Sequence, residues 1–402
     1  RSPLMMVIKI AIGTVVGVMP ILTFRVRSLK LCEMLSLREP SSIVTSPLNT
    51  DMNIVNDWVT QLGLSSELLM KTLGHLTITG HSDLHPISVE LESLFLNSTK
   101  TVQYIQEHLS EVSSLAALRF LPSIISYVEV GDCIHRKARY GDPLCELLLT
   151  ALVYHIAPDL ERLRIPVNAQ QVFSYRWLEE GHQCFDPAIN WSAFEQAELA
   201  DLKASKMVGL VDISNCYGSI RPNILISTLK KSGISDTHIS AIIDLLNELG
   251  FELDGLPVGG TASRVLAEAC LNPIDHALKA RGVNFIRFVD DYRIFSEDHS
   301  ALRRSLIALN EELGARGLSI NKSKLRLFKS AHLAIQREAK ITLITHQDKD
   351  SDLTVTRDRF DPYSQLIGRQ VETLKSISKS QSLHQALSYE LDKLSPCYRS
   401  LK

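Results

Sequence analysis

The sequence has no paired cysteines. Seven cysteines are scattered over 402 residues, and no two of them form a Cys-x-x-Cys pair. An odd number of isolated cysteines is not the pattern of a disulfide-rich secreted domain, and the missing pairs argue against a zinc ribbon. We therefore expect a reducing compartment and predict a cytoplasmic location.

A large net charge is also missing. Lys and Arg number 43 and Asp and Glu number 45, for a net charge of −2, which argues against a protein that coats nucleic acid nonspecifically. The charge is unevenly placed, however. Residues 41–130 carry 3 basic and 9 acidic side chains, whereas residues 301–340 carry 9 basic and 3 acidic ones. This asymmetry indicates that a polyanion contacts the later region, with a solvated surface as the alternative.

Internal repeats and low-complexity linkers are absent. With 45% hydrophobic and 22% charged residues, the composition is that of an ordinary globular protein. A chain of this length holds one large domain or two to three ordinary ones.

The chain has one long apolar run near its start, "LMMVIKIAIGTVVGVMPILTF" at 4–24. Its length approaches that of a membrane span. Lys9 and Pro20 interrupt the run, and its many β-branched residues also suit buried strands. We therefore predict no membrane anchor at 4–24, although the length alone would allow one.

The first half of the chain has the spacing of helices. Segments such as "TVQYIQEHLSEV" at 101–112 place apolar residues three and four apart. The basic, turn-rich stretch "HRKARYGDP" follows at 135–143. The apolar segment 144–163 then predicts a buried helix that ends near Pro158.

After residue 200 the pattern alternates between strands and helices. Strands are predicted at 207–213, in a hairpin at 285–295 and at 318–328, with helices between them. This order predicts an α+β fold, in which a small mixed sheet packs against helices on one face.

Two adjacent carboxylates interrupt the predicted hairpin "FIRFVDDYRIF". Asp290 and Asp291 lie between two apolar, strand-like runs. They could simply form the turn, because Asp side chains hydrogen-bond their own backbone. Alternatively, they bind hard divalent cations, which prefer oxygen ligands and offset the repulsion between the carboxylates.

A third carboxylate, Asp212, ends the predicted strand in "GLVDISNCYGSI", and Tyr217 follows five residues later. If this strand lies beside the hairpin, Asp212 and Asp290 meet at one edge of the sheet. Three clustered carboxylates require compensating cations. A pair of Mg²⁺ ions, with Mn²⁺ as an alternative, is a known device for phosphoryl transfer.

These segments resemble the reverse transcriptases. "LVDISNCYGSI" resembles palm motif A of that family, and "GLPVGGTASRVLAEACL" at 255–271 resembles motif B. "FVDD" at 288–291 resembles motif C, and "LSINKSKLRLF" at 318–328 resembles motif D. The four motifs occur in the order of the family. "VFSYRW" at 172–177 is similar to an upstream fingers motif.

The resemblance implies the right-hand polymerase fold, with a ferredoxin-like palm, fingers and a helical N-terminal region. The implied parts follow one another along the chain: an apolar N-terminal segment (1–40), a helical region (41–128), fingers (129–200), the catalytic palm (201–330) and a thumb-like or C-terminal region (331–402).

The resemblance also implies roles for particular residues. Asp212, Asp290 and Asp291 would hold the two metal ions, and Lys324 would neutralise or protonate the leaving pyrophosphate. The residues implied to contact the nucleotide or template are Tyr217, Arg176, Gly255, Pro257 and Gly259, with Arg136, Lys137 and Arg139 as further phosphate ligands. Turn-forming glycines and solvated basic residues are the alternatives.

The implied activity is an RNA-directed DNA polymerase that adds dNTPs on an RNA or DNA template-primer. A homo-oligomer is a further candidate assembly. The closest resemblance is to bacterial defence enzymes of the abortive-infection type, through "SYR", "SNCYGSI" and "ASRVLAEACL". Val258 replaces a Gln common in motif B, which leaves relaxed or absent template dependence open.

Two other functions are compatible with these motifs. An RNA-dependent RNA polymerase has similar palm aspartates, but an aromatic Tyr217 under the sugar would reject a 2′-hydroxyl. An inactive palm could act as a nucleic-acid-binding module, although it would not need to keep three clustered carboxylates.

Overall fold

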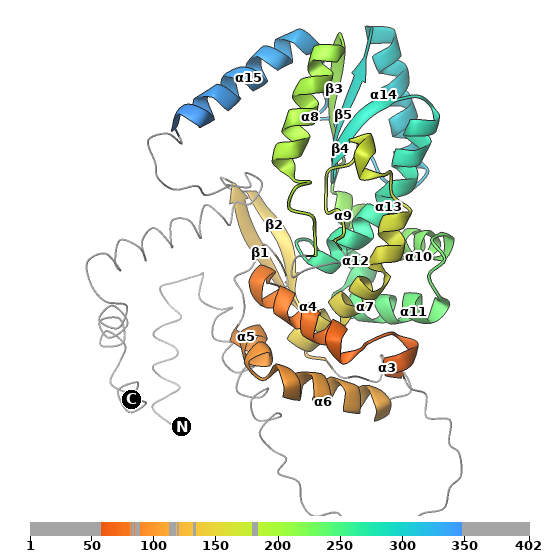
Figure 1. Cartoon of the computed structure of the whole chain (residues 1–402). Coiled ribbons are helices and arrows are strands. Elements are labelled where there is room, and N and C mark those ends of the chain that lie inside the picture. Colours follow the sequence, from red (N-terminus) through yellow and green to blue (C-terminus); the bar gives the residue numbers. More distant parts are fainter. Residues whose placement is uncertain are drawn as a thin grey trace, which may run out of the picture.

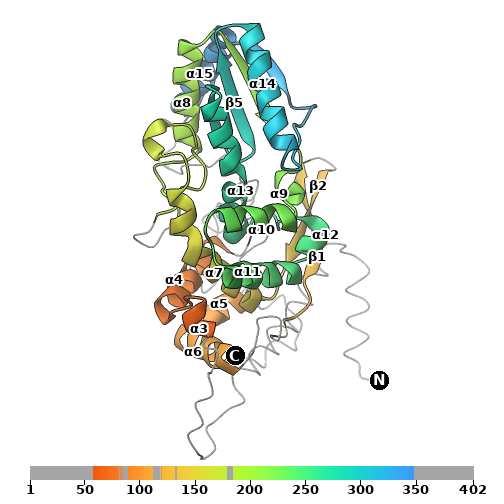
Figure 2. The ribbon, with the colours of Figure 1, turned by 90° about the vertical axis from the view of Figure 1, so that its right-hand side faces the viewer.

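A computed structural model describes residues 58–347, apart from 81, 83, 85–88, 112–117, 119, 132–133 and 179–183. Figures 1 and 2 both show a sheet with its covering helices at one end of this part and a group of helices at the other. The predicted segment 4–24 lies outside the described residues, as does most of the predicted thumb-like region.

The central sheet has four strands in the order β4-β5-β3-β6. The strands are β3 (Met207–Asp212), β4 (Asn284–Phe288), β5 (Asp291–Ser296) and β6 (Arg326–Lys329). All three strand pairs are antiparallel. The predicted strand at 318–328 is therefore confirmed only in its last residues, and Ile320 makes an isolated bridge to Ile213.

Helices cover both faces of this sheet (Figure 2). Helices α13 (Thr261–Ala280) and α14 (His299–Gly314) lie on one face. The sequence predicts helices on one face only, and that part of the prediction is wrong. Helices α8 (Trp191–Ala204) and α15 (Ser330–Gln347) cover the opposite face, where Val208, Ile286 and Phe295 pack against them. Successive side chains of a strand point to opposite faces, so these strands are apolar on both.

The second half of the fold is built around α7 (Pro143–Arg162), most of whose side chains are buried. Asp142 caps its start by accepting a hydrogen bond from Leu144 N, and Pro143 occupies the first turn, where no N–H is needed. The helix continues through Pro158 to Arg162, so the predicted end near Pro158 is wrong.

The other helices of this half are grouped with α7 (Figure 1). They are α3 (Trp58–Gln61), α4 (Ser66–Thr79), α5 (Val89–Leu96), α6 (Ser98–Glu111), α9 (Cys216–Ser219), α10 (Pro222–Lys231), α11 (Asp236–Glu248) and α12 (Phe251–Asp254), with a short 3₁₀ turn at Val167–Ala169. Within the described residues α7 alone is long and apolar enough to cross a membrane, but 78% of its most apolar stretch is buried in the protein.

A separate antiparallel hairpin joins β1 (Ile124–Gly131) to β2 (Ile134–Tyr140). It begins inside the range 41–128 that the sequence predicts to be helical, so that boundary is wrong by a few residues. Asp142 Oδ2 accepts a hydrogen bond from Leu121 N at 2.9 Å, which ties the start of the hairpin to the start of α7.

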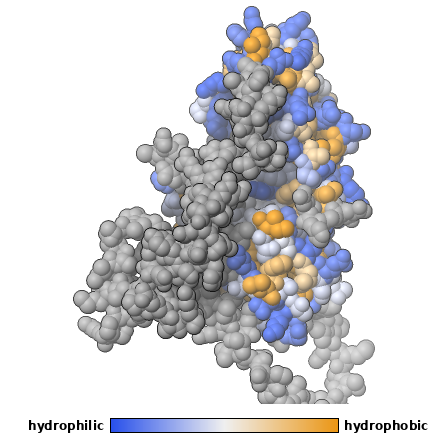
Figure 3. Space-filling view, turned by 60° about the vertical axis from the view of Figure 1, so that its left-hand side comes forward, coloured by the Kyte–Doolittle hydropathy of each residue, from blue (hydrophilic) through white to orange (hydrophobic). Residues whose placement is uncertain are grey.

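Where Figure 3 shows described residues, small hydrophobic patches alternate with hydrophilic side chains. The most exposed large apolar side chains come from different elements: Ile78, Leu96, Tyr127, Leu253 and Ile335. Scattered apolar residues of this kind are normal on a folded protein.

We predict that Phe194→Ala lowers the free energy of unfolding by about 3–5 kcal/mol. Phe194 is fully buried between α8 and the sheet, where its ring lies 5.0 Å from that of Trp191 and 5.9 Å from that of Phe288. Urea denaturation measures the effect, with Phe95→Ala as the control because Phe95 is 44% exposed on α5. Equal losses in the two variants would contradict this account of the core.

Candidate functional site

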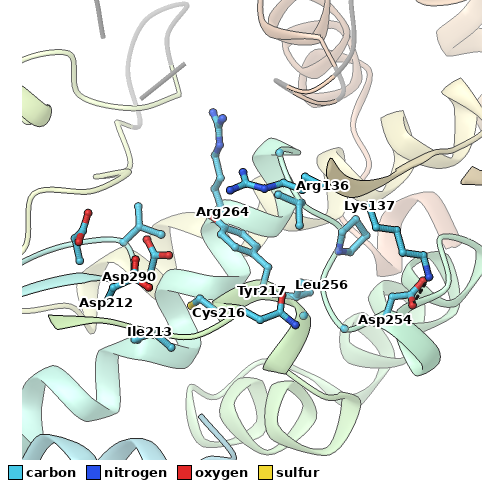
Figure 4. Close-up of a pocket in the computed structure, with 18 of the residues that line it drawn as sticks. Arg136, Lys137, Asp212, Ile213, Cys216, Tyr217, Asp254, Leu256, Arg264 and Asp290 are labelled. Atoms are coloured by element: carbon cyan, nitrogen blue, oxygen red, sulfur yellow. Dashed lines mark hydrogen bonds and ion pairs between the residues drawn. The ribbon is translucent and has the colours of Figure 1, made fainter. Parts of the chain in front are cut away.

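An open cleft of about 660 Å³ lies between the sheet edge and the β1–β2 hairpin. Figure 4 shows Asp212 and Asp290 at one end of it, Lys137 and Asp254 at the other, and the Tyr217 ring between them. The residues that line the cleft include nearly all of the predicted site: Arg136, Lys137, Arg139, Asp212, Tyr217, Gly255, Pro257, Gly259, Asp290, Asp291 and Lys324.

Strand pairing brings the three predicted carboxylates together. Asp212, the last residue of β3, is the direct cross-strand partner of Asp291, the first residue of β5. Asp290 lies in the two-residue loop between β4 and β5, and its carbonyl oxygen accepts a hydrogen bond from Ile213 N at 3.1 Å. The juxtaposition predicted from the sequence is therefore present.

The carboxylates perturb one another. Burial raises the pKa of Asp290 to about 7, and the charges of Asp291 and Asp212 add to the effect. Burial also raises the pKa of Asp291, while Arg293 opposes the shift. A buried carboxyl group beside two others holds its proton closer to neutral pH, and perturbed groups of this kind are typical of functional sites.

Three side chains partly compensate this charge. Lys324 Nζ donates to Asp212 Oδ1 at 2.7 Å, and Asn321 Nδ2 donates to Asp212 Oδ2 at 3.0 Å. Arg293 Nη1 lies 3.4 Å from Asp291 Oδ1. The hydrogen bond to Asp212 raises the pKa of Lys324, so its ammonium is charged at neutral pH.

The donor chemistry of the edge fits divalent metal ions. Carboxylate oxygens are the ligands that Mg²⁺ prefers, and cations would relieve the repulsion that raises the pKa of Asp290. Among the described residues, no group of three or more His, Cys, Asp or Glu side chains is already arranged around one metal position. Lys324 meanwhile occupies one oxygen of Asp212.

The loop before α13 packs tightly against the turn that carries Tyr217. Leu256 N donates to Tyr217 O at 3.0 Å. Gly255 has a φ of +75°, and a Cβ there would lie 2.5 Å from the Gly218 carbonyl oxygen. Glycine is therefore needed at 255 both for its conformation and for this close approach. The half-buried Tyr217 ring forms the floor of the cleft between the two charged ends.

The other end of the cleft is basic. Lys137 Nζ donates to Asp254 Oδ1 at 2.7 Å, and Arg139 Nε donates to Asp254 Oδ2 at 2.8 Å. These bonds lower the pKa of Asp254 and join the β1–β2 hairpin to α12. Arg136 lines the cleft with no ion pair to any described residue.

The prediction for Arg176 is wrong. Its side chain is only 3% exposed and does not line the cleft. Arg176 Nη1 donates to Ile165 O at 2.9 Å, and its guanidinium pairs with Glu161. A buried, paired arginine supports the fold and cannot reach a nucleotide in the cleft.

Several residues that line the cleft were not among the predicted site residues, including Arg264, Tyr175 and Trp191. Arg264 lies over the Tyr175 ring, 4.9 Å from its centroid. The Trp191 ring lies 5.1 Å from that of Phe288. Arg264 lies in the segment that resembles motif B and Tyr175 in the segment that resembles a fingers motif, so both could have been found from the sequence. No sequence signal pointed to Trp191.

Comparisons with known proteins identify a family for this part of the chain. Residues 143–350 match the sequence profile of the family described as reverse transcriptase (RNA-dependent DNA polymerase). No curated protein matches the chain at a significant level.

Two similar solved structures are telomerases. One, from Candida albicans in complex with a TWJ fragment of telomeric RNA, is 12% identical, with a TM-score of 0.36 over 60% of this chain and 46% of that one. The other, apo telomerase from Candida tropicalis truncated from the C-terminal domain, is 11% identical, with a TM-score of 0.38 over 51% of this chain and 49% of that one. This chain thus spans about half the length of each telomerase, and the likeness is too distant to carry an argument about function.

We predict that, without divalent metal, stability falls as the pH rises from about 4 to about 7. The folded pKa of Asp290, about 7, lies above the ordinary value of 3.8, so the native state binds this proton more tightly than the unfolded state. Asp290→Asn should remove this loss and stabilise the protein at pH 8 by a few kcal/mol, since each pKa unit is worth about 1.4 kcal/mol.

Thermal unfolding in EDTA between pH 4 and pH 8 measures the effect. Asp298→Asn is the control, because a hydrogen bond from the Ala301 N–H lowers the pKa of Asp298. An Asp290→Asn variant with the pH slope of the wild type would contradict the prediction.

Proposed function

Because the profile covers residues 143–350, more than half of the chain, the chain belongs to the reverse transcriptase (RNA-dependent DNA polymerase) family, and we propose that it adds deoxynucleotides to a 3′-hydroxyl. Proteins of this family have the right-hand polymerase fold, and the chain shares it. The observation that carries the proposed activity is the convergence of Asp212, Asp290 and Asp291 at one end of a cleft whose other end is basic.

We assign the parts of the polymerase hand accordingly. The palm is 201–330, the fingers are 129–200, and 331–402 forms a thumb-like or C-terminal region. The β1–β2 hairpin begins at Ile124, so the fingers would start a few residues before 129, and the hairpin faces the palm aspartates across the cleft.

Asp212, Asp290 and Asp291 would hold two Mg²⁺ ions, or Mn²⁺, which activate an attacking hydroxyl and neutralise phosphate charge in phosphoryl transfer. Lys324 neutralises Asp212 in the metal-free protein through its 2.7 Å hydrogen bond. Its side chain is 63% exposed and can move to the leaving pyrophosphate, where an ammonium can donate a proton.

The basic strand β2 supplies the other half of the substrate site. Arg136 is exposed in the cleft and can pair with triphosphate or template phosphates. Lys137 and Arg139 share the single negative charge of Asp254, so this cluster keeps a net positive charge that favours phosphate binding.

We further propose that the polymerase acts in bacterial antiphage defence, in the cytoplasm. The support is the resemblance of "SYR", "SNCYGSI" and "ASRVLAEACL" to abortive-infection enzymes. Val258 lines the cleft at the motif B position where many relatives have Gln, which supports synthesis with relaxed template dependence. Assays therefore need arms with and without template and with and without co-purified RNA.

We predict that Asp290→Asn combined with Asp291→Asn abolishes incorporation of labelled dNTPs in Mg²⁺ while the protein stays folded. The change removes two metal ligands and also relieves repulsion, so the melting temperature should not fall. Glu311→Gln combined with Glu312→Gln is the matched control, since it neutralises an adjacent carboxylate pair on α14 that contacts Arg281 and not the cleft. Wild-type extension by the aspartate variant would overturn the assignment of these residues, whereas a wild-type protein that incorporates no dNTP would favour a binding module.

We predict that Tyr217→Ala raises the efficiency of ribonucleotide use relative to deoxynucleotide use by about one to two decades. A close-packed aromatic wall excludes an extra oxygen at a cost of roughly 1–3 kcal/mol. The measurement is kcat/KM for dGTP and GTP, with Tyr217→Phe as the control that keeps the ring. An unchanged ratio in a folded, active Tyr217→Ala variant would rule out the gate, and a wild type that prefers GTP would favour an RNA polymerase.

A further inference from the structure

The turn that carries the candidate metal ligands has a strained residue at its centre. Val289 has a φ of +54°, in the left-handed region that β-branched residues rarely adopt. It is the first residue of the two-residue loop between β4 and β5, where a positive φ matches the twist of the paired strands. Glycine or asparagine is usual there, so the surrounding structure must hold valine in this conformation.

Two buried side chains hold both backbone groups of Val289. Ser174 Oγ accepts a hydrogen bond from Val289 N at 2.9 Å. Arg287 Nη1 donates to Val289 O at 2.9 Å. The peptide groups of the turn are therefore fixed from the side away from the cleft.

These two side chains belong to a buried network centred on Glu268 of α13. Ser174 Oγ donates to Glu268 Oε1 at 2.6 Å, and Arg287 Nη2 donates to Glu268 Oε2 at 2.8 Å. Arg164 Nη2 also donates to Glu268 Oε2 at 2.7 Å, and Arg287 Nε donates to Asp275 Oδ1 at 2.9 Å. Two arginines thus balance two carboxylates.

The network is almost completely removed from water. Arg287 is 0% exposed, Ser174 is 0% and Glu268 is 2%. Burying charges is costly, and apolar residues of similar volume often stabilise a core as well or better. A contribution to stability therefore explains poorly why the protein buries these charges. Their hydrogen bonds to one particular backbone conformation explain it better.

The network reaches the turn through a segment distant in sequence. Residues 171–174 pair with the outer edge of β4: Arg287 N donates to Gln171 O at 2.7 Å, and Phe173 N donates to Arg287 O at 2.9 Å. This pairing places the Ser174 hydroxyl beneath Val289. The "SYR" segment therefore supports the turn through Ser174 and not the nucleotide through Arg176.

We propose that Ser174, Glu268 and Arg287 are positioning residues that lock Val289 in its left-handed conformation and so set the orientation of Asp290 and Asp291. They contact neither nucleotide nor metal, and they act through the backbone of the turn. The expected effect on catalysis rests on the proposed function. The expected effect on the orientation of the carboxylates is tested by metal binding alone.

Ser174→Ala tests the proposal by removing one hydroxyl. We expect Mn²⁺ binding, followed by the electron paramagnetic resonance of free Mn²⁺, to weaken about tenfold, the factor that one hydrogen bond is worth. The expected kinetic change is a lower kcat for dNTP incorporation with little change in the KM for dNTP. Ser330→Ala is the matched control, because Ser330 is also fully buried and its hydroxyl lies 2.8 Å from that of Ser205. This control should bind Mn²⁺ as the wild type does.

A second variant separates positioning from stability. Glycine adopts a positive φ without support, so adding Val289→Gly to Ser174→Ala should restore most of the lost Mn²⁺ affinity. Adding Val289→Ala should not, because alanine removes the side chain but keeps the conformational penalty. A loss caused by general destabilisation would not be repaired by glycine at 289.

The outcomes are distinct. Weakened Mn²⁺ binding in Ser174→Ala with recovery by glycine, and not by alanine, supports the proposal. Wild-type Mn²⁺ binding in Ser174→Ala, or equal results for glycine and alanine, overturns it. If the wild type binds Mn²⁺ but incorporates no dNTP, the proposed polymerase function fails while the metal-binding comparison still decides the positioning role.

Discussion

Electrostatic repulsion between three carboxylates at one sheet edge is the constraint on which the rest of the site depends. Pairing of β3 with β5 places Asp212 opposite Asp291, and the turn adds Asp290 beside them. The pKa of Asp290, raised to about 7 by burial and by its two neighbours, reflects this crowding. A sheet edge of this kind is stable only where cations approach it and where the backbone prevents the carboxylates from moving apart.

The protein meets these two needs on opposite sides of the turn. On the cleft side, Lys324 binds Asp212 at 2.7 Å. Arg293, which is buried and pairs with Glu198 of α8, approaches Asp291 from the face covered by that helix. Beneath the turn, the network around Glu268 holds Val289 by both of its backbone groups. The side chain of Lys324 is 63% exposed, whereas the network around Glu268 is buried. The compensating charge therefore lies at the surface of the cleft, and the support for the backbone lies in the core.

The cleft separates opposite charges, although the chain as a whole carries a net charge of only −2. The aspartates of the sheet edge face the basic strand β2 across the Tyr217 ring (Figure 4). Asp254 holds two of the basic side chains and ties the hairpin to α12. A substrate with phosphates at one end and a metal-bound reacting group at the other fits this polarity, as the proposed nucleotidyl transfer requires.

Local patterns in the sequence were enough to predict the strands β3, β4 and β5 and the helices between them, because these follow from short-range periodicity. The meeting of Asp212 with Asp290 was predicted only on the condition that β3 lies beside the hairpin, and the pairing of β3 with β5 meets that condition. Tertiary structure decided the rest, because it depends on contacts between distant segments. The side chain of Arg176 points inward and pairs with Glu161, which lies 15 positions earlier on α7. Helices α8 and α15 cover a second face of the sheet. Ser174 came to lie beneath Val289, 115 positions away in the chain. Local periodicity cannot specify which buried ions will meet, since that depends on how whole helices and strands pack.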